Sequence, residues 1–283
     1  MELKYINNQH ICNMKEKNGV AYVTFPKLSV YEKELVHGFS TRLGGVSEEH
    51  LASMNLSFTR GDDREKVMEN HRRFARALGY DETRLVFSDQ VHLTRFHKVT
   101  RADSGKGIVR ESDIKEIDGL VTDEPGIPII TFYADCVPLF FFDPVKKVIA
   151  MAHSGWRGTV ERIGAKMVSC MEKEYGSRPQ DIVCAIAPSI CQKCYEVSED
   201  VALRFLEVFG NSFGEELLYQ KENGKYQLNL HKVCEITLLE AGIGREHLDV
   251  TDLCTCCNPD VFFSHRASHG RRGNLAGVMM LKE

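Results

Sequence analysis

The chain has 283 residues, with 36 lysines and arginines against 40 aspartates and glutamates, which gives a formal net charge of −4. This mildly acidic balance argues against a dedicated nucleic-acid-binding protein, because such proteins usually carry a basic excess. Hydrophobic residues make up 43% of the chain and charged residues 27%, which excludes intrinsic disorder as its main state.

Short runs rich in Val, Ile, Phe and Tyr predict strands. In chain order they are residues 22–25, 36–40, 85–87, 119–122, 129–133, 139–142, 148–152, 182–187, 247–253 and 276–281. Apolar periodicity and capping residues predict helices at about 62–78, 159–175, 198–209 and 230–241. The strands outnumber the helices and alternate with them irregularly, which favours a mixed sheet with helices outside it, an α+β arrangement in one domain.

The longest apolar stretch, residues 127–142, contains Asp135 and two prolines. It falls short of the roughly 20 residues of a membrane helix, so it predicts two buried strands and no membrane partner. Residues 1–19 lack the apolar core of a signal peptide, and we expect a cytoplasmic protein. Thiols are kept reduced in that compartment, so clustered cysteines there suggest metal binding or catalysis rather than disulfides.

Three polar residues, His92, Cys136 and His153, each lie where an apolar run leaves the predicted core. Two neutral imidazoles and one thiolate form a plausible zinc site with a position left open for water or substrate. The same residues could instead form a pair in which Cys136 is a nucleophile and a histidine is its base. Spacing does not separate these alternatives, and His97, in a predicted strand, competes with His92 as a ligand.

Two glycine-containing turns and a basic tail are candidates for binding an anion. Arg157 lies in the turn Ser154-Gly155-Trp156-Arg157-Gly158, which leads into a predicted helix whose free amides favour anions. This pentapeptide alone fits a tight turn with a packed tryptophan slightly better. Ser40 and Arg42 begin the second turn, residues 40–47, where the arginine binds an anion or is solvated. The tail segments 263–266 and 271–273 form a basic cluster that could meet a negatively charged substrate.

The remaining cysteines include two clusters, one at Cys191 and Cys194 and the other at residues 254–257. The gap between them far exceeds the roughly 15–20 residues that separate the two halves of a zinc ribbon. We therefore expect buried thiols here rather than a second metal site. The chain also lacks a His-x-His pair of the kind that a multinuclear copper oxidase uses.

Seven segments, in order, resemble the YfiH family, also called laccase-domain or multicopper polyphenol oxidase proteins. They are residues 37–47, 90–92, 118–122, 134–139, 153–158, 194–197 and 263–266. The resemblance covers the chain from about residue 36 to its end. It predicts one catalytic domain over residues 1–283, with residues 1–35 as a less certain N-terminal extension. His265 differs from the tyrosine of many relatives.

The resemblance implies a fold of layered mixed β-sheets flanked by helices. It implies a purine nucleoside phosphorylase acting on adenosine, inosine, guanosine and methylthioadenosine, with adenosine deaminase activity at the same site. The family's ligands match His92, Cys136 and His153, so these would hold one zinc ion and form the catalytic centre. The expected partners are purine nucleosides and phosphate, and the expected state is a monomer or small homo-oligomer.

On this hypothesis Ser40, Arg42 and Arg157 contact the substrate or its phosphate, and Asp135 either orients a ligand histidine or caps a turn. Family members have also been described as copper polyphenol oxidases and as peptidoglycan editing factors. Copper is therefore the alternative metal, and a metal-free cysteine amidase is the rival enzyme. A zinc-stabilised binding module is the non-enzymatic alternative.

Overall fold

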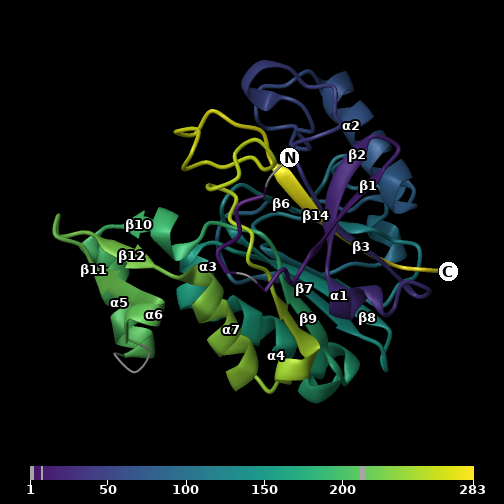
Figure 1. Cartoon of the computed structure of the whole chain (residues 1–283). Coiled ribbons are helices and arrows are strands. Elements are labelled where there is room, and N and C mark those ends of the chain that lie inside the picture. Colours follow the sequence, from purple (N-terminus) through teal and green to yellow (C-terminus); the bar gives the residue numbers. More distant parts are fainter. Residues whose placement is uncertain (1–2, 8, 211–213) are drawn as a thin grey trace.

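The computed structural model describes residues 3–7, 9–210 and 214–283. It confirms a mixed α/β fold, in which two large β-sheets pack together and helices cover their outer faces (Figure 1). A third, small sheet projects from the side of this body. The two large sheets carry the strand ends that hold the candidate site.

The first large sheet has five strands and is antiparallel throughout. In spatial order its strands are β1 (Asn13–Lys17), β2 (Val20–Thr24), β3 (Leu35–Ser40), β14 (Leu275–Leu281) and β6 (Ile129–Tyr133). Residues 13–24 thus pair directly with the body of the fold. The C-terminal strand lies in the interior of the sheet, between β3 and β6.

The second large sheet has six strands and is mixed, because the β13–β9 and β4–β5 pairs are parallel. In spatial order its strands are β13 (Leu248–Val250), β9 (Val183–Ile186), β7 (Val137–Asp143), β8 (Val148–Ser154), β5 (Gly119–Thr122) and β4 (Phe96–Lys98). Every residue of β7 and β8 is buried, since one face packs on the first sheet and the other on helices. Burial of both faces explains why these strands are almost continuously apolar.

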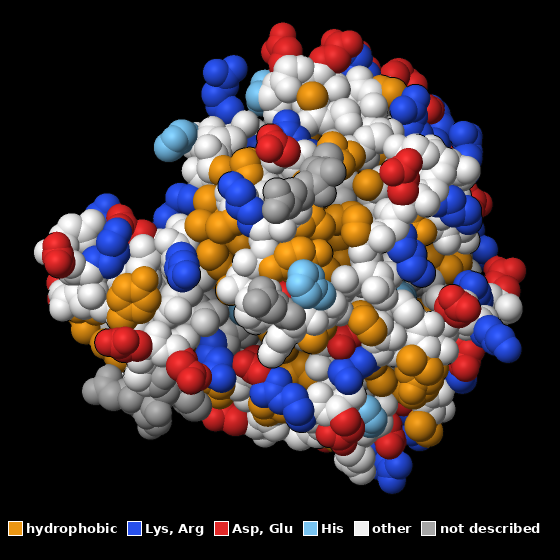
Figure 2. All heavy atoms as spheres, in the orientation of Figure 1, with side chains coloured by type: hydrophobic (Ala, Val, Ile, Leu, Met, Phe, Trp, Pro, Cys, Tyr) orange, Lys and Arg blue, Asp and Glu red, His pale blue; other side chains and the backbone are white. Residues whose placement is uncertain are grey.

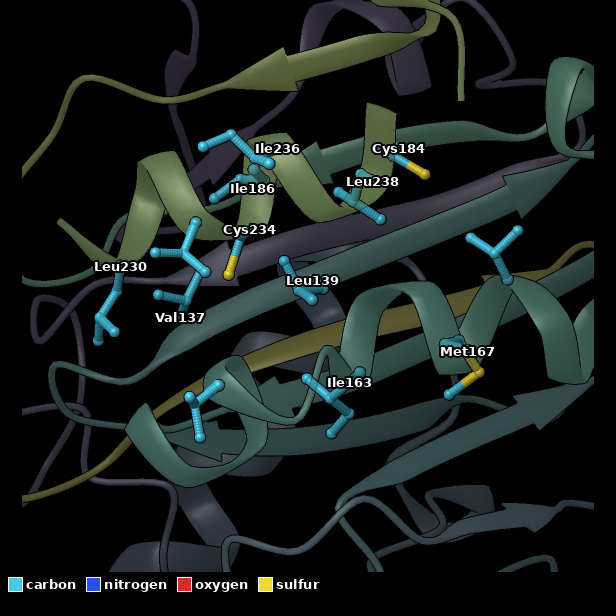
Figure 3. Packing of buried hydrophobic residues seen from close by; sticks show 14 of the residues in the cluster. Val137, Leu139, Ile163, Met167, Cys184, Ile186, Leu230, Cys234, Ile236 and Leu238 are labelled. Carbon is cyan, nitrogen blue, oxygen red and sulfur yellow. The ribbon is translucent and has the colours of Figure 1, made fainter. Parts of the chain in front are cut away.

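Helices α4 (Ile163–Tyr175) and α7 (Leu230–Glu240) cover the outer face of the second sheet. Figure 3 shows Val137 and Leu139 of β7 pointing toward Ile163 of α4 and toward α7. Helix α2 (Arg64–Leu78) packs beside the first sheet, where its apolar face, including Val67, is buried. The shorter helices are α1 (Pro26–Ser29), α3 (Trp156–Val160), α5 (Glu199–Phe209) and α6 (Gly214–Leu217).

The small sheet consists of β10 (Glu196–Val197), β12 (Tyr226–Leu228) and β11 (Leu218–Gln220). Together with α5 and α6 it forms the lobe at the left of Figure 1. Figure 2 shows the whole molecule from the side seen in Figure 1. Charged side chains of both signs are intermixed around this face, and hydrophobic side chains gather near its middle. Within the described part of the chain, every helix is too short or too polar to cross a lipid bilayer.

Several predicted elements differ from those observed, among them the strand predicted at 247–253, which is reduced to β13. The predicted helix over 159–175 is two helices, because Arg162 adopts a left-handed conformation with φ of 61° between α3 and α4. The predicted strand over 85–87 is reduced to a single bridge between Val86 and Ile129. Helix α2 begins at residue 64 rather than 62, because Asp63 caps it by accepting the amides of residues 65 and 66 with its carboxylate.

Candidate active site

The carboxylate of Asp118 organises the site from a buried position just before β5. It accepts hydrogen bonds from the backbone amides of Val91, His92 and Leu93 at 3.1, 2.9 and 2.8 Å. These bonds hold a tight loop in which His92 takes a left-handed conformation with φ of 64°. One acidic side chain therefore fixes the backbone that presents the first histidine.

The same carboxylate also orients His153, which is buried near the end of β8. Its Nδ1 atom lies 2.8 Å from Asp118 Oδ1, which leaves Nε2 as the ring atom available to a ligand. The His92 and His153 rings lie edge to face, with centroids 4.7 Å apart. A carboxylate on the far nitrogen of a histidine is the usual way in which proteins orient a metal ligand.

Cys136 completes the group from the turn between β6 and β7. Its Sγ atom lies 3.9 Å from His92 Nε2, and one potential ligand atom from each of Cys136, His92 and His153 lies within 4.8 Å of the others. The structure thus brings together the three residues that the sequence analysis selected. Two imidazoles and a thiolate suit zinc and leave a coordination position open.

Electrostatics favour the ionised form of this thiol. Burial alone raises the pKa of Cys136, but the adjacent His153 and His92 lower the pKa to about 6. Burial likewise lowers the pKa of His153, whereas the Cys136 thiolate and Asp118 raise the pKa to about 9. Without a metal these groups form a thiolate–imidazolium pair, and with one they are the anionic and neutral donors that a divalent cation takes up.

Gly155, directly after β8, leaves the room that the three side chains occupy. A Cβ atom added there would lie 2.6 Å from His92 Cδ2 and 3.3 Å from Cys136 Sγ. The first distance is shorter than a van der Waals contact, so any larger residue would displace the histidine. The glycine in the 154–158 turn is therefore a steric requirement of the site.

A cavity of about 300 Å³ contains all three side chains. Aromatic rings line part of its wall, namely Phe58, Phe87 and Phe132. The site is assigned here rather than to the larger hollow of about 710 Å³ beside β13 and α7, which does not contain the His92, Cys136 and His153 group. An apolar wall with a few polar groups is typical of a small-molecule site.

Two guanidinium groups, Arg60 and Arg272, also line this cavity. Burial and the neighbouring Arg60 lower the pKa of Arg272 to about 10. Among the described residues, Arg272 Nε and Asn274 Oδ1 are buried without a hydrogen-bond partner. A buried cationic donor and a buried acceptor without partners point to a polar, negatively charged ligand.

The arginines predicted to bind phosphate do not line this cavity. Arg42 donates to the carbonyl oxygens of Ala52 and Pro259 at 2.7 and 2.8 Å and lies over the ring of Phe263. Arg157 lies over the ring of Trp156 on the other side of the turn. Backbone carbonyls and an aromatic ring already occupy the Arg42 guanidinium, and the arginines that line the cavity are Arg60 and Arg272.

Ser40 and Asp135 likewise have structural partners. The Ser40 hydroxyl is buried and accepts the amide of Ala276 at 2.9 Å. Asp135 accepts the Thr255 hydroxyl and the Arg266 amide, both at 2.7 Å. Asp135 therefore links the turn before β7 to the loop over residues 255–266, and Asp118 instead contacts the ligand histidine.

His97 lies on β4, where its Nε2 atom is 3.2 Å from Asp103 Oδ2, outside the group of potential ligands. The sequence pattern alone does not indicate a role for Asp118 or Arg60. A carboxylate directly before a fully buried strand was the available signal for Asp118. Arg272 belonged to the predicted basic cluster in the tail.

A sequence profile described as multi-copper polyphenol oxidoreductase laccase matches residues 36–282 of the chain. A Bacillus subtilis (strain 168) protein named purine nucleoside phosphorylase YlmD is 35% identical over 282 residues, which cover 98% of this chain and 100% of that protein. The crystal structure of Bacillus licheniformis hypothetical protein YfiH superposes with a TM-score of 0.88 at 33% identity, covering 95% of this chain and 99% of that one. The crystal structure of YlmD from Geobacillus stearothermophilus superposes with a TM-score of 0.86 at 32% identity, covering 97% of this chain and 100% of that one.

A mixed α/β fold with a His–Cys–His group in a cavity places the chain in the class of metal-binding laccase-domain proteins. The chain belongs to the YfiH family, as the profile match over most of its length shows. The resemblance carried by the seven sequence segments is thereby confirmed. The family description refers to polyphenol oxidation by a multi-copper enzyme, whereas the B. subtilis relative is named purine nucleoside phosphorylase.

Proposed function

We propose that this protein is a zinc-dependent purine nucleoside phosphorylase acting on adenosine, inosine, guanosine and methylthioadenosine, with adenosine deaminase activity at the same site. The observation that carries the proposal is the convergence of His92, Cys136 and His153 in a cavity that two guanidinium groups also line, one of which has a buried Nε donor without a partner. The name of the B. subtilis relative supports the same reaction.

The three donors fit a zinc ion. Asp118 on Nδ1 of His153 leaves Nε2 free for the metal, and the depressed pKa of Cys136 favours the thiolate that zinc binds. His92, Cys136 and His153 would hold the ion, which supplies a Lewis acid at the cavity wall. A mononuclear site made of these donors fits zinc better than the several coppers of a polyphenol oxidase.

The rest of the cavity suits the two substrates of phosphorolysis. Phe87 and Phe132 pack edge to face with centroids 5.1 Å apart, and their rings offer an apolar surface to a purine. Arg272 and Arg60 bind the phosphate and neutralise its charge. A phosphate oxygen then forms a bond to the anomeric carbon of the ribose, while the bond to the purine nitrogen breaks and the purine leaves with a proton.

Replacing one ligand tests this assignment. Cys136→Ala is expected to lose the bound zinc together with phosphorolysis and deamination, because it removes the anionic donor. The measurement is the metal content of the purified protein, alongside chromatography of an incubation with adenosine and phosphate. His97→Ala is the matched control and should keep both activities. Full zinc content and turnover in Cys136→Ala would show that the ligand assignment is wrong.

A second candidate function is a metal-free cysteine amidase. The line from Cys136 through His153 to Asp118 has the order of nucleophile, base and orienting acid. Inactivation by iodoacetamide that a chelator leaves unchanged would favour this alternative. Phosphorolysis that stops on chelation and returns with added zinc would favour the nucleoside reaction.

A further inference from the structure

A second group of possible metal ligands lies outside the cavity and consists of Cys191, Cys194, Cys254 and Cys257, here called the four-cysteine cluster. The sequence spacing predicts buried thiols rather than a second metal site, because residues 195–253 lie between the two Cys-x-x-Cys pairs. The structure shows all four sulfur atoms within 4.8 Å of one another. The long separation in sequence therefore does not keep the two pairs apart in space.

Strand pairing explains how the two Cys-x-x-Cys pairs meet. β9 and β13 are adjacent parallel strands, so their carboxyl ends leave the sheet at the same edge. The parallel pairing continues beyond the strands as a bridge between Ser189 and Cys254. Each pair follows one of these strands, and the intervening residues form the connection between them. Spatial adjacency thus replaces the short spacing of a zinc ribbon.

The sulfur positions suit a single tetrahedral ion. Cys257 Sγ lies 3.4 Å from Cys194 Sγ and 4.0 Å from Cys191 Sγ. A regular tetrahedron with metal–sulfur bonds of about 2.3 Å places its sulfurs about 3.8 Å apart. An iron–sulfur cluster would spread its cysteines more widely, because several irons and bridging sulfides lie between them.

Backbone amides support anionic sulfur in the cluster. The amide of Cys257 donates to Cys254 Sγ at 3.4 Å, and the amide of Cys191 donates to the same sulfur at 3.2 Å. Bonds from amides to sulfur stabilise a thiolate, which is the form that binds metal. Cys191 and Cys254 are buried and the other two are half-buried, so protein surrounds most of the site.

We propose that the four-cysteine cluster binds one structural Zn²⁺ in a closed tetrahedral site, separate from the ion proposed in the cavity. Four thiolates with no open position are typical of structural rather than catalytic zinc. Cys256 lies beside the cluster without belonging to the group of mutual neighbours, so the site uses four of the five cysteines in the two segments.

The proposed ion holds a wall of the cavity in place. The second Cys-x-x-Cys pair includes Thr255, which bonds to Asp135 beside Cys136. Arg266 lies further along the same loop and donates to the carbonyl oxygens of Cys194 and Glu196 at 3.0 and 2.9 Å. The loop then continues to Arg272 in the cavity. Zinc would join the start of this loop, at residues 254–257, to residues 191–194, which lead into the small lobe.

Zinc counting with matched serine variants tests the proposal. Protein purified under reducing conditions is expected to hold about two zinc ions per chain, falling to about one in Cys257→Ser. Cys256→Ser is the matched control and should keep about two. Equal zinc in Cys257→Ser and the unaltered protein would overturn the proposal, as would iron in the site or two disulfides found by mass spectrometry after alkylation.

Cys136→Ala separates this proposal from the proposed function. It removes the cavity ligand set, so the zinc it keeps, about one ion, is expected to be bound by four sulfurs at about 2.3 Å in X-ray absorption. If the unaltered protein holds a single ion that Cys136→Ala keeps and Cys257→Ser loses, the metal of the proposed function fails and the four-cysteine site stands. If Cys257→Ser does not fold, the test is made on Cys136→Ala with cobalt in place of zinc. Four thiolates around cobalt are expected to give strong thiolate-to-cobalt charge-transfer absorption, and absence of this absorption would refute the four-cysteine site.

Discussion

Asp118 shows how much of the site depends on one side chain. Its two oxygens accept three backbone amides and face Nδ1 of His153, so it fixes both a loop and a ring. Burial alone would raise the pKa of Asp118, but His153 and the amides of Leu93 and Val91 lower it. The carboxylate therefore stays ionised, as these contacts require.

Asp118→Asn is expected to weaken zinc binding by about 10–100-fold, the usual effect of losing a group that orients a ligand histidine. The side-chain NH₂ of asparagine is a donor, and it would face the backbone amides or the His153 Nδ1 atom, which are themselves donors. Competition with a chromogenic chelator measures the affinity, and Asp113→Asn, at an exposed carboxylate, is the control. An unchanged affinity in Asp118→Asn would remove its orienting role.

Arg272→Ala is expected to raise the KM for phosphate about tenfold or more, because a bond between two charged groups contributes about 1.5–3 kcal/mol. Deamination of adenosine needs no phosphate and should change less. The measurement is the phosphate dependence of purine release, and Arg271→Ala, an exposed neighbour, is the control. Equal losses in both reactions would contradict a role specific to phosphate.

At the scale of elements, the turn from β8 into α3 supplies the space for the ligands. Gly155→Ala is expected to displace His92 and to lower zinc content, because its Cβ atom would lie 2.6 Å from the ring. Gly158→Ala in the same turn is a matched control, since its Cβ atom would meet neighbours only at 3.6 Å. Metal analysis of the two purified variants compares them, and equal zinc in both would refute the steric requirement.

Elements with a strong apolar pattern could be predicted from the sequence, and short ones could not. The strands at 119–122 and 129–133 have the predicted bounds because both faces of each are largely buried. β10, β11 and β12 have only two or three residues each, too few to show a periodicity. The break at Arg162 was missed because the residues on either side of it are both helical.

Some residues of the candidate site could likewise be predicted from the sequence and others could not. His92, Cys136 and His153 could be predicted because each lies within a few residues of the end of an apolar run and is a residue type that binds metal. The partners of Arg42 could not, because Ala52 and Pro259 reach it only through tertiary packing. The four-cysteine cluster was missed for a related reason, since its spacing is set by the pairing of β9 with β13.

At the scale of the whole molecule, three buried histidines make stability depend on pH. Burial lowers the pKa of His71 and of His231 to about 4 and that of His37 to about 3. His37 Nε2 accepts the amide of Phe25 at 3.1 Å, a bond that protonation would break. In the unfolded chain all three pKa values return to about 6.5, so the unfolded state binds more protons in mild acid.

The free energy of unfolding is therefore expected to fall as the pH drops from about 6.5 toward 4. Three histidines that stay neutral only in the folded state give a slope of up to about 4 kcal/mol per pH unit. Urea titrations at several pH values measure it, and His71→Gln should remove about a third of this slope. A free energy of unfolding that stayed constant between pH 6.5 and 4.5 would contradict the prediction.

The position of β14 has a consequence for how the chain acquires its shape. The strand is the last of the sequence, yet it lies between β3 and β6 and follows directly after Arg272 and Asn274 of the cavity wall. During synthesis β3 and β6 therefore lack the strand that lies between them until residues 275–281 emerge from the ribosome. Such late, long-range closure is slow, and a nascent chain truncated before residue 275 would carry two unpaired strand edges prone to aggregation.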